Sequence, residues 1–170
     1  MKKGTITETG AGERLAPSFE DFFRSEYGRL ASTLQLLTGD AGEAEDDAQE
    51  ALSRVFERWD RVRNMDSSTG YVYRTALNLY RKRLRRREKG APADPATGSD
   101  PTLIAETRIA IRQALVALST EQREALVLVE WVGLDASEAG AVLGISPESV
   151  RARIHRARSA LRSWFGGIDE

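Results

Sequence analysis

Apolar residues recur at spacings of three and four along most of this 170-residue chain, which is the period of an α-helix with one buried face. Such stripes run over residues 18–37, 40–59 and 71–87, and again over 103–118 and 119–132. No stretch alternates between apolar and polar residues with the period of two that a half-buried strand requires. The pattern therefore predicts an all-α fold.

Serine and aspartate mark where the helices begin. Ser18, Asp40 and Ser119 each precede a stripe, and Glu43 and Gln122 follow the last two at the spacing of a capping box. We expect the buried sides to hold Phe19, Phe22, Phe23, Tyr27, Leu30, Leu34, Leu37, Ala44, Ala48, Ala51, Leu52, Val55, Phe56, Trp59, Tyr73, Leu77, Tyr80, Leu84, Ile104, Ile111, Ala114, Leu115, Leu118, Ala125, Leu126, Val129 and Trp131.

A stretch rich in proline and glycine separates two groups of helices. Residues 90–101 contain three Pro and two Gly and nothing large and apolar, which is the composition of a flexible linker. We therefore expect two small helical domains, arranged as an N-terminal tail (1–17), a first domain (18–87), a linker (88–102), a second domain (103–165) and a C-terminal tail (166–170).

The stretch that begins at Asp135 predicts a helix, a tight turn and a second helix. Asp135 and Glu138 have the spacing of a capping box, and Gly144 ends the first helix where a left-handed backbone is needed. Ser146 is a suitable N-cap for the next helix, with Pro147 at its first position. These signals are typical of a helix-turn-helix.

The second of these two helices has an apolar side and an arginine-rich side. Val150, Ile154 and Ala157 share the apolar side with Leu161 and Trp164. The other side carries Ser149, Arg151, Ala152, Arg153, His155 and Arg156. A small residue lets the backbone approach a major groove, and guanidinium groups reach base edges and phosphates. A solvated surface helix is the alternative, but the caps, the turn and this polarity together favour binding to duplex DNA.

Composition excludes several classes of function. The chain has no cysteine and a single histidine, which excludes disulfides and thiolate zinc sites and makes a histidine metal cluster implausible. It has neither an apolar run long enough to cross a bilayer nor the pattern of a signal peptide. Asp46 and Asp47 are adjacent and face different ways on a helix, so they do not suggest an enzyme. We expect a cytoplasmic protein with no cofactor, no metal and no membrane contact.

The net charge of −1 hides a strong segregation of charge. Residues 40–50 hold six acids and no base, residues 81–89 hold seven bases and one acid, and the C-terminal helix carries five arginines. Local fields of this kind, rather than the total charge, attract nucleic acid. The acidic run suggests a second and different partner.

The acidic run has two explanations. Asp46, Gln49, Glu50 and Ser53 share one side of the helix predicted over 40–59. Acids near a helix start are also favoured by the helix dipole. A solvated acidic side and a docking side therefore fit these residues equally well.

The basic run follows a helix start with two tyrosines. Arg74, Asn78, Arg81 and Arg85 form a polar stripe beside the apolar one, which fits a line of phosphate contacts with one amide for a base edge. Tyr71 is placed to stack on a base, although a core position is the alternative, and we expect Tyr73 in the core.

Taken in order, these segments resemble the extracytoplasmic-function (ECF) sigma factors of the sigma-70 family, minimal promoter-specificity subunits of bacterial RNA polymerase, in their SigE-like actinobacterial form. Residues 44–51 followed by Trp59 are similar to the family's region-two signature. Residues 71–79 are similar to its DNA-melting helix, and the stretch from Leu118 to Leu161 is similar to region four. The order and spacing of these segments carry the resemblance.

The resemblance implies a role for each cluster. Docking on the clamp helices of the polymerase's largest subunit falls to Asp46, Gln49, Glu50 and Ser53. Capture and holding of the opened minus-ten element falls to Asn64, Ser67, Ser68, Tyr71, Arg74, Asn78, Arg81 and Arg85. Recognition of the duplex minus-thirty-five element falls to Ser149, Arg151, Ala152, Arg153, His155 and Arg156.

The resemblance also implies partners. A sigma factor has no chemistry of its own and acts by directing core polymerase to specific promoters, where transcription begins. The implied partners are the core polymerase, through its clamp helices and flap, and promoter DNA, and many relatives also bind an anti-sigma protein. The free chain is expected to be a monomer.

Four residues depart from the family's pattern. Tyr71 stands where Trp is usual and Leu77 where Arg is common. Gly140 replaces a usual Ala at a cost of about 1 kcal/mol in helix propensity. Asp47 takes a position that is usually apolar, so its burial would mean that the register assigned to that helix is off by one residue.

A stand-alone helix-turn-helix regulator is the alternative function. Such a protein needs a dimerisation or ligand-sensing domain to match its half-sites, and residues 18–87 are the segment that would supply it. Because a basic helix and an acidic side are unusual for a ligand pocket, the sigma factor is the favoured function.

Overall fold

The structure, a computed structural model, describes residues 18–90 and 103–166, with side chains of the second segment from residue 109 onward. The predicted N-terminal tail, most of the predicted linker and residues 167–170 lie outside the described residues. Every regular element in the described part is helical, which confirms the predicted all-α fold.

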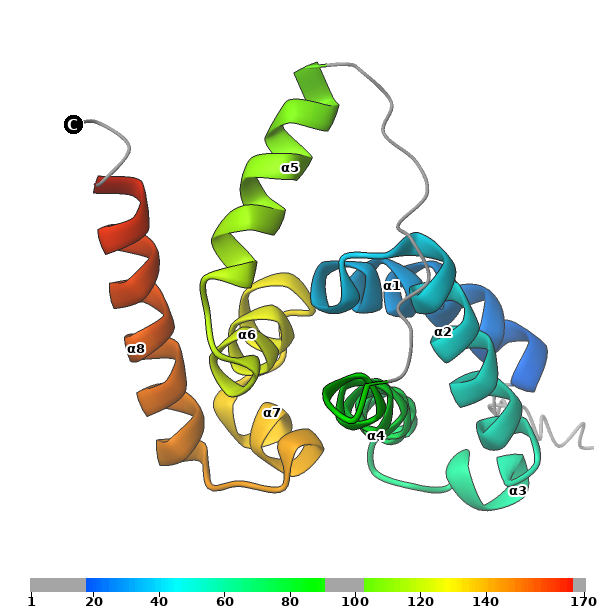
Figure 1. Cartoon of the computed structure of the whole chain (residues 1–170). Helices are drawn as coiled ribbons and strands as arrows, with labels where there is room; N and C mark the ends of the chain where they lie inside the picture. The colour runs from blue at the N-terminus through cyan, green and yellow to red at the C-terminus, as the bar shows by residue number, and fades with distance from the viewer. Residues whose placement is uncertain (1–17, 91–102, 167–170) are drawn as a thin grey trace, which may run out of the picture.

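The first half of the chain contains α1 (Phe19–Thr38), α2 (Ala41–Phe56), the single turn α3 (Trp59–Val62) and α4 (Ser68–Glu88). α1 packs against α2, and α4 packs against both (Figure 1). In Figure 1, α4 is seen nearly end-on between α2 and α7.

The second half contains α5 (Leu103–Val116), α6 (Thr120–Leu126), the π-helix η1 (Val127–Trp131), α7 (Ala136–Leu143) and α8 (Pro147–Gly166). α8 packs against α6 and α7. The outer ends of α5 and α8 project away from the other helices (Figure 1).

Side chains at the predicted cap positions begin these helices. Ser18 caps α1, and Ser119 caps α6 within a complete capping box. Asp40 accepts a hydrogen bond from the backbone N–H of Glu43, as expected of a cap. The capping box predicted there is wrong, however, because the Glu43 carboxylate forms an ion pair with Arg87 on α4 instead.

The helix boundaries differ from the prediction on either side of α3. α2 ends at Phe56, and α4 begins at Ser68, three residues before the predicted start at Tyr71. The earlier start has a local cause, because the Ser67 hydroxyl accepts a hydrogen bond from the Gly70 N–H at 2.9 Å and so acts as an N-cap. The loop before α4 is correspondingly short.

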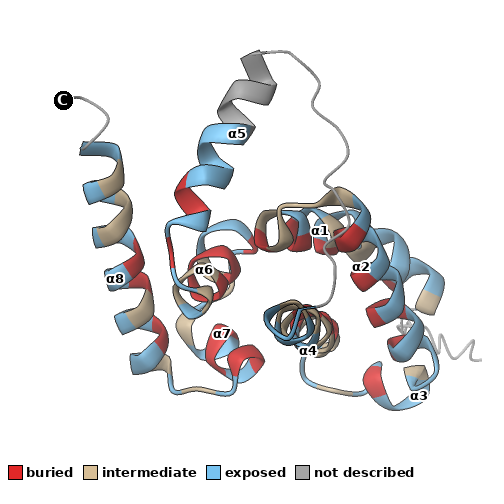
Figure 2. Cartoon of the chain, viewed as in Figure 1, coloured by how far each residue is buried: buried red, intermediate tan, exposed pale blue. Residues whose placement is uncertain are grey.

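The two halves share one continuous hydrophobic core (Figure 2). α4 packs against α7, and α1 packs against η1 and α5. Arg29 on α1 donates a hydrogen bond to the Val132 carbonyl, and the Arg123 guanidinium on α6 donates to the Leu37 carbonyl at 3.2 Å. The two groups of helices predicted from the sequence are therefore in direct contact in this structure.

Most of the predicted core is buried, but Phe23, Phe56, Ile111 and Trp131 are exposed. Phe56 is the last residue of α2. One side of its ring is covered by Phe19, with the two ring centroids 4.8 Å apart. The outer part of α5 projects away from the other helices (Figure 1), and Ile111 is exposed to solvent. The side chain of Ile104 lies outside the described residues. Five more of the predicted core residues are only half-buried: Phe19, Tyr27, Trp59, Leu84 and Val129.

Trp131 is exposed because of the π-helix. Its turn contains more residues than an α-helical turn, and the Val132 N–H accordingly bonds the Val127 carbonyl five residues back. The apolar side is thereby rotated, so that Val127 and Leu128 are buried and Trp131 is 55% exposed.

Candidate nucleic-acid interfaces

The helix-turn-helix forms as predicted, with α7 as its first helix and α8 as its second. Asp135 and Glu138 close a capping box, and Gly144 adopts a left-handed backbone with φ of 73°. A Cβ atom at Gly140 would lie 2.7 Å from the Ile145 carbonyl oxygen. Glycine at this position therefore permits the close approach of helix and turn. Ser146 accepts a hydrogen bond from the Ser149 N–H, which begins α8 with Pro147 at its first position.

α8 presents the predicted recognition side to solvent. Val150, Ile154 and Ala157 are buried. The opposite side consists of Ser149, Arg151, Ala152, His155 and Arg156, all exposed, with Arg153 half-buried. The backbone hydrogen bond at the helix start lowers the pKa of the Glu148 carboxyl, so Glu148 is an anion beside Arg151, at 3.5 Å.

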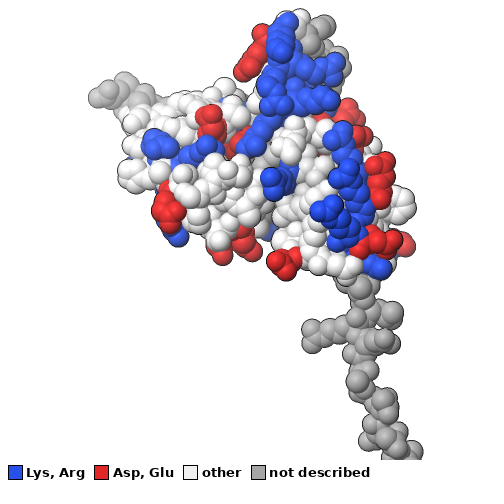
Figure 3. Space-filling model, turned by 90° about the horizontal axis from the view of Figure 1, so that it is seen from below, with Lys and Arg blue, Asp and Glu red and all other residues white. Residues whose placement is uncertain are grey.

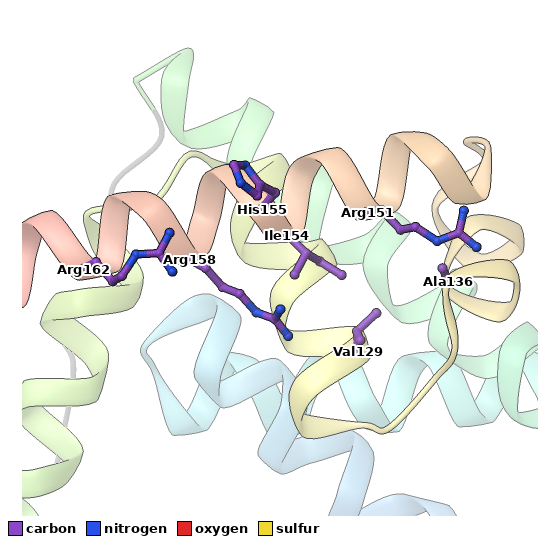
Figure 4. A pocket seen from close by; sticks show the side chains of 7 residues that line it. All are labelled: Val129, Ala136, Arg151, Ile154, His155, Arg158 and Arg162. Atoms are coloured by element: carbon purple, nitrogen blue, oxygen red, sulfur yellow. The ribbon is translucent and has the colours of Figure 1, made fainter.

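A groove of about 410 Å³ lies beside this recognition side. Ile154 and Arg158 point from α8 toward η1, where Val129 lies, whereas Arg151 extends toward Ala136 at the start of α7 (Figure 4). Arg162 also lines the groove and adds a further guanidinium group. Arg158 is ion-paired with Glu130 on η1. The groove thus has an apolar floor and a basic rim along α8.

The basic helix α4 exposes three of its four predicted stripe residues. Arg74, Asn78 and Arg85 are exposed, together with Lys82 and Arg86. Figure 3 shows Lys and Arg side chains gathered on the face seen from below. This arrangement offers cations to phosphates and one amide to a base edge.

Arg81 does not share that exposed stripe. Its Nε and Nη2 atoms donate to the two carboxylate oxygens of Glu124 on α6, at 2.8 and 2.6 Å. These hydrogen bonds raise the pKa of the Arg81 guanidinium above its usual value. A carboxylate 43 residues away therefore holds Arg81 in this structure, and its contact with DNA stays a prediction.

The predicted base-capture residues lie in the loop before α4 and in its first turn. Asn64 and Ser67 are exposed, and the Asn64 side-chain amide donates to the Asp60 carbonyl at 2.7 Å. Ser68 is on α4 rather than in the loop, and its hydroxyl donates to the Val62 carbonyl at 2.9 Å. Tyr71 is half-buried, which leaves part of its ring accessible.

Two exposed arginines, on α3 and in the turn before it, are not among the residues predicted to hold DNA. Arg58 and Arg61 are both exposed, and the Arg58 guanidinium donates to the Tyr71 hydroxyl at 3.5 Å. They belong to a run of four arginines between residues 54 and 63. This run is a sequence signal for a basic surface, but it is weaker than the run at 81–89, which has seven bases.

The acidic side of α2 is exposed as predicted. Asp46, Gln49, Glu50 and Ser53 all face solvent, with Glu50 paired to Arg54 at 2.8 Å. Asp46 and Glu50 border a groove of about 490 Å³ between α2 and α4 that also includes Lys82 and Arg86.

Asp47 is buried, yet the helix register is correct. Its side chain is 6% exposed and pairs with Arg83 on α4 at 2.6 Å. The residues predicted to be buried on the same helix side, from Ala44 to Val55, are buried. The expectation that burial of Asp47 implies a register error is wrong, because an ion pair compensates the buried carboxylate.

Among the described residues, no group of three or more His, Asp or Glu side chains is placed to hold a metal ion. In the same part of the chain, no helix combines the length and hydrophobicity needed to span a membrane.

The two halves match two family models. Sigma-70 region 2 matches residues 22–90, and Sigma-70, region 4 matches residues 108–161. The chain is 34% identical over 176 residues to the ECF RNA polymerase sigma factor SigE of Mycolicibacterium smegmatis, covering 95% of this chain and 67% of that protein. It is 30% identical over 163 residues to the ECF RNA polymerase sigma factor SigM of Mycobacterium tuberculosis, covering 94% and 82%.

Solved structures of low identity share the fold. The sigma factor RpoE of Bartonella quintana, in complex with the anti-sigma factor NepR, superposes with a TM-score of 0.74 at 20% identity and covers 87% of this chain and 96% of its own. CnrH in complex with the cytosolic domain of CnrY gives a TM-score of 0.69 at 24% identity, covering 88% of each chain. By the two family models and the sequence relatives, the chain belongs to the ECF RNA polymerase sigma factors of the sigma-70 family.

Proposed function

We propose that this sigma factor binds core polymerase through α2 and contacts its promoter through two separate surfaces, one on α4 and one on α8. The observation that supports this division is the exposure of three chemically distinct sides, on α2, α4 and α8, each on a helix whose opposite side is buried. The stand-alone regulator finds no support among the relatives.

The polymerase contact is assigned to Asp46, Gln49, Glu50 and Ser53. They are exposed on one side of α2, and their carboxylates suit a basic partner surface. The partner is the pair of clamp helices of the polymerase's largest subunit, and the second half of the sigma factor contacts the flap.

The opened minus-ten strand is assigned to the start and the exposed stripe of α4. Asn64, Ser67 and Tyr71 receive unstacked bases, while Arg74, Asn78 and Arg85 follow the strand. Arg58 and Arg61 extend the line of phosphate contacts past Tyr71 onto α3 and the turn before it, because both are exposed and the Arg58 guanidinium donates to the Tyr71 hydroxyl. The Ser68 hydroxyl is already engaged by the Val62 carbonyl and has a secondary part at most.

The duplex minus-thirty-five element is assigned to the exposed side of α8. Ser149, Arg151, Ala152, His155 and Arg156 enter the major groove with Arg153 at its edge, in the manner of a recognition helix. Arg158 and Arg162 lie further along the helix and contact flanking phosphates.

The proposed cellular setting follows the family. One solved neighbour is a sigma factor in complex with an anti-sigma factor, and we extend an anti-sigma partner to this chain. We place the free protein in the cytoplasm as a monomer that initiates transcription without catalysing a reaction itself.

Run-off transcription with bacterial core polymerase on a library of genomic promoter fragments tests the proposal. We expect specific transcripts that depend on this protein, with start sites that define both promoter elements. If core polymerase neither binds the protein nor gains specificity from it, while the protein alone shifts duplex DNA, the proposed function is wrong.

A further inference from the structure

Arg81 and Glu124 form a bidentate ion pair between the two halves of the chain. The two N–H···O distances are 2.8 and 2.6 Å. The Glu124 side chain is only 1% exposed, whereas the Arg81 side chain retains 29% of its exposure. The carboxylate is thus enclosed, while the guanidinium lies at the edge of the junction.

Further contacts between α4 and the second half of the chain accompany this ion pair. α4 packs along α7, and a Cβ atom at Gly70 near the start of α4 would lie 3.8 Å from a Val142 methyl group on α7. Leu77, which stands between Gly70 and Arg81 on α4, is 2% exposed. The α4 side that carries Arg81 is therefore covered by the second half of the chain.

A carboxylate offers a guanidinium the same fork of two oxygens that a phosphate offers. Arg81 stands in the sequence between Asn78 and Arg85, two residues assigned to the opened strand. We propose that Glu124 occupies the place of a DNA phosphate on Arg81, so that the free sigma factor is held closed and its strand-binding helix is incomplete until the pair is exchanged for DNA. This inference rests on the proposed function.

The closed form is also incompatible with the proposed reading of both promoter elements. Their names place them about 25 base pairs apart, which is about 85 Å of duplex at about 3.4 Å per base pair. In the structure α4 is in direct contact with α7, the first helix of the helix-turn-helix. The halves must separate for both surfaces to reach their elements, and the Arg81–Glu124 pair breaks in that step.

Two charge-removing variants separate a latch from a merely structural pair. Glu124→Gln removes the charge that competes with phosphate and leaves Arg81 free, whereas Arg81→Gln opens the same junction but removes the phosphate contact. Glu130→Gln is the matched control, because it removes a carboxylate from an exposed ion pair in the same half of the chain.

The measurements are closure of the free chain and affinity for a single-stranded oligonucleotide carrying the minus-ten element. Since the chain has no cysteine, Ser32→Cys on α1 and Ser159→Cys on α8, both at exposed positions, accept a donor and an acceptor dye for energy transfer. We expect lower transfer efficiency in Glu124→Gln and Arg81→Gln than in wild type and Glu130→Gln. If about one wild-type molecule in ten is open, we expect Glu124→Gln to bind the oligonucleotide about tenfold more tightly, and Arg81→Gln to show no such gain.

Unchanged transfer efficiency and unchanged affinity in Glu124→Gln overturn the proposal. If circular dichroism shows that Glu124→Gln does not fold, the transfer efficiency of Arg81→Gln tests the proposal instead. A wild-type transfer efficiency in Arg81→Gln would show that the chain stays closed without this pair, and would overturn the latch. Run-off transcription by the wild-type protein is measured in parallel. Its absence counts against the proposed function, whereas normal transcription with an unresponsive Glu124→Gln counts against the latch alone.

Discussion

Arg83 on α4 holds the buried carboxylate of Asp47 on α2 through both of its oxygens, at 2.6 and 3.3 Å. This pair, together with Glu43 and Arg87, ties the acidic helix to the basic helix. It also removes Arg83 and Arg87 from the set of cations available to DNA.

We expect Arg83→Met to lower the free energy of unfolding by about 3 kcal/mol, because it leaves Asp47 buried and unpaired. The double variant Asp47→Leu/Arg83→Met is expected to recover most of that loss, since an apolar pair needs no compensation. Urea denaturation measures both. Arg54→Ala, at the exposed pair with Glu50, serves as the control and should cost less than about 1 kcal/mol; a similar cost at both sites would contradict the argument.

We expect Asp46→Ala/Gln49→Ala to abolish binding to core polymerase while leaving the melting temperature unchanged, because both side chains are exposed on α2. Binding is measured by co-elution with core polymerase. Glu45→Ala, an exposed acid that points about 100° away from Asp46 around the helix, is the matched control and should bind normally. Equal binding by the double variant and wild type would refute the docking surface.

We expect Asn78→Ala to leave polymerase binding intact and to reduce strand opening, because this exposed amide is assigned to the opened strand rather than to the protein partner. Permanganate reactivity of unpaired thymines in the polymerase–promoter complex reports the effect. Gln35→Ala, an exposed amide on α1, is the control. Normal reactivity in Asn78→Ala would remove Asn78 from the minus-ten site.

We expect Arg58→Ala/Arg61→Ala to weaken binding to single-stranded DNA in a salt-dependent way. The slope of log affinity against log salt concentration is negative, and each lost phosphate contact on a single strand makes it shallower by about 0.7. The slope of the double variant should therefore be shallower than that of wild type by about 1.4. Arg24→Ala, on an arginine paired with Glu20 near the start of α1, should keep the wild-type slope. A double variant with that same slope would show that the strand does not pass beside Tyr71.

We expect Arg151→Ala to weaken recognition of the minus-thirty-five element by about 1–3 kcal/mol and to relax preference at one base position. Competition binding with a set of single-base promoter variants measures both effects. Arg162→Ala, on the same helix but further from the recognition side, should weaken binding evenly across the set. An unchanged base preference in Arg151→Ala argues against the major-groove assignment.

Sequence reasoning succeeded where the signals are local. The turn between α7 and α8 follows from Gly144, Ser146 and Pro147, whose backbone requirements act within a few residues. The exposed sides of α2 and α8 follow from helical periodicity alone. Sequence order and spacing also sufficed to identify the family.

The errors arise where a distant residue or a change of helix type decides the outcome. No local pattern shows that Arg81 bonds a carboxylate 43 positions away or that Arg83 neutralises Asp47. The α-helical period predicts Trp131 in the core, but the π-helical turn of η1 brings it to the surface. The start of α4 was missed because Ser67 acts as a cap within a segment that otherwise has the composition of a loop.

The outward rotation of Trp131 gives the protein a native optical reporter. An indole that is 55% exposed emits at longer wavelength than an enclosed one, and this one is adjacent to Val132, whose carbonyl accepts the hydrogen bond from Arg29 across the junction of the two halves. A partner that covers this end of η1, or a rearrangement of the junction, changes the surroundings of that indole. Because the chain has two other tryptophans, Trp59 and Trp164, the fluorescence of Trp131 can be followed without a dye once those two are replaced by Phe.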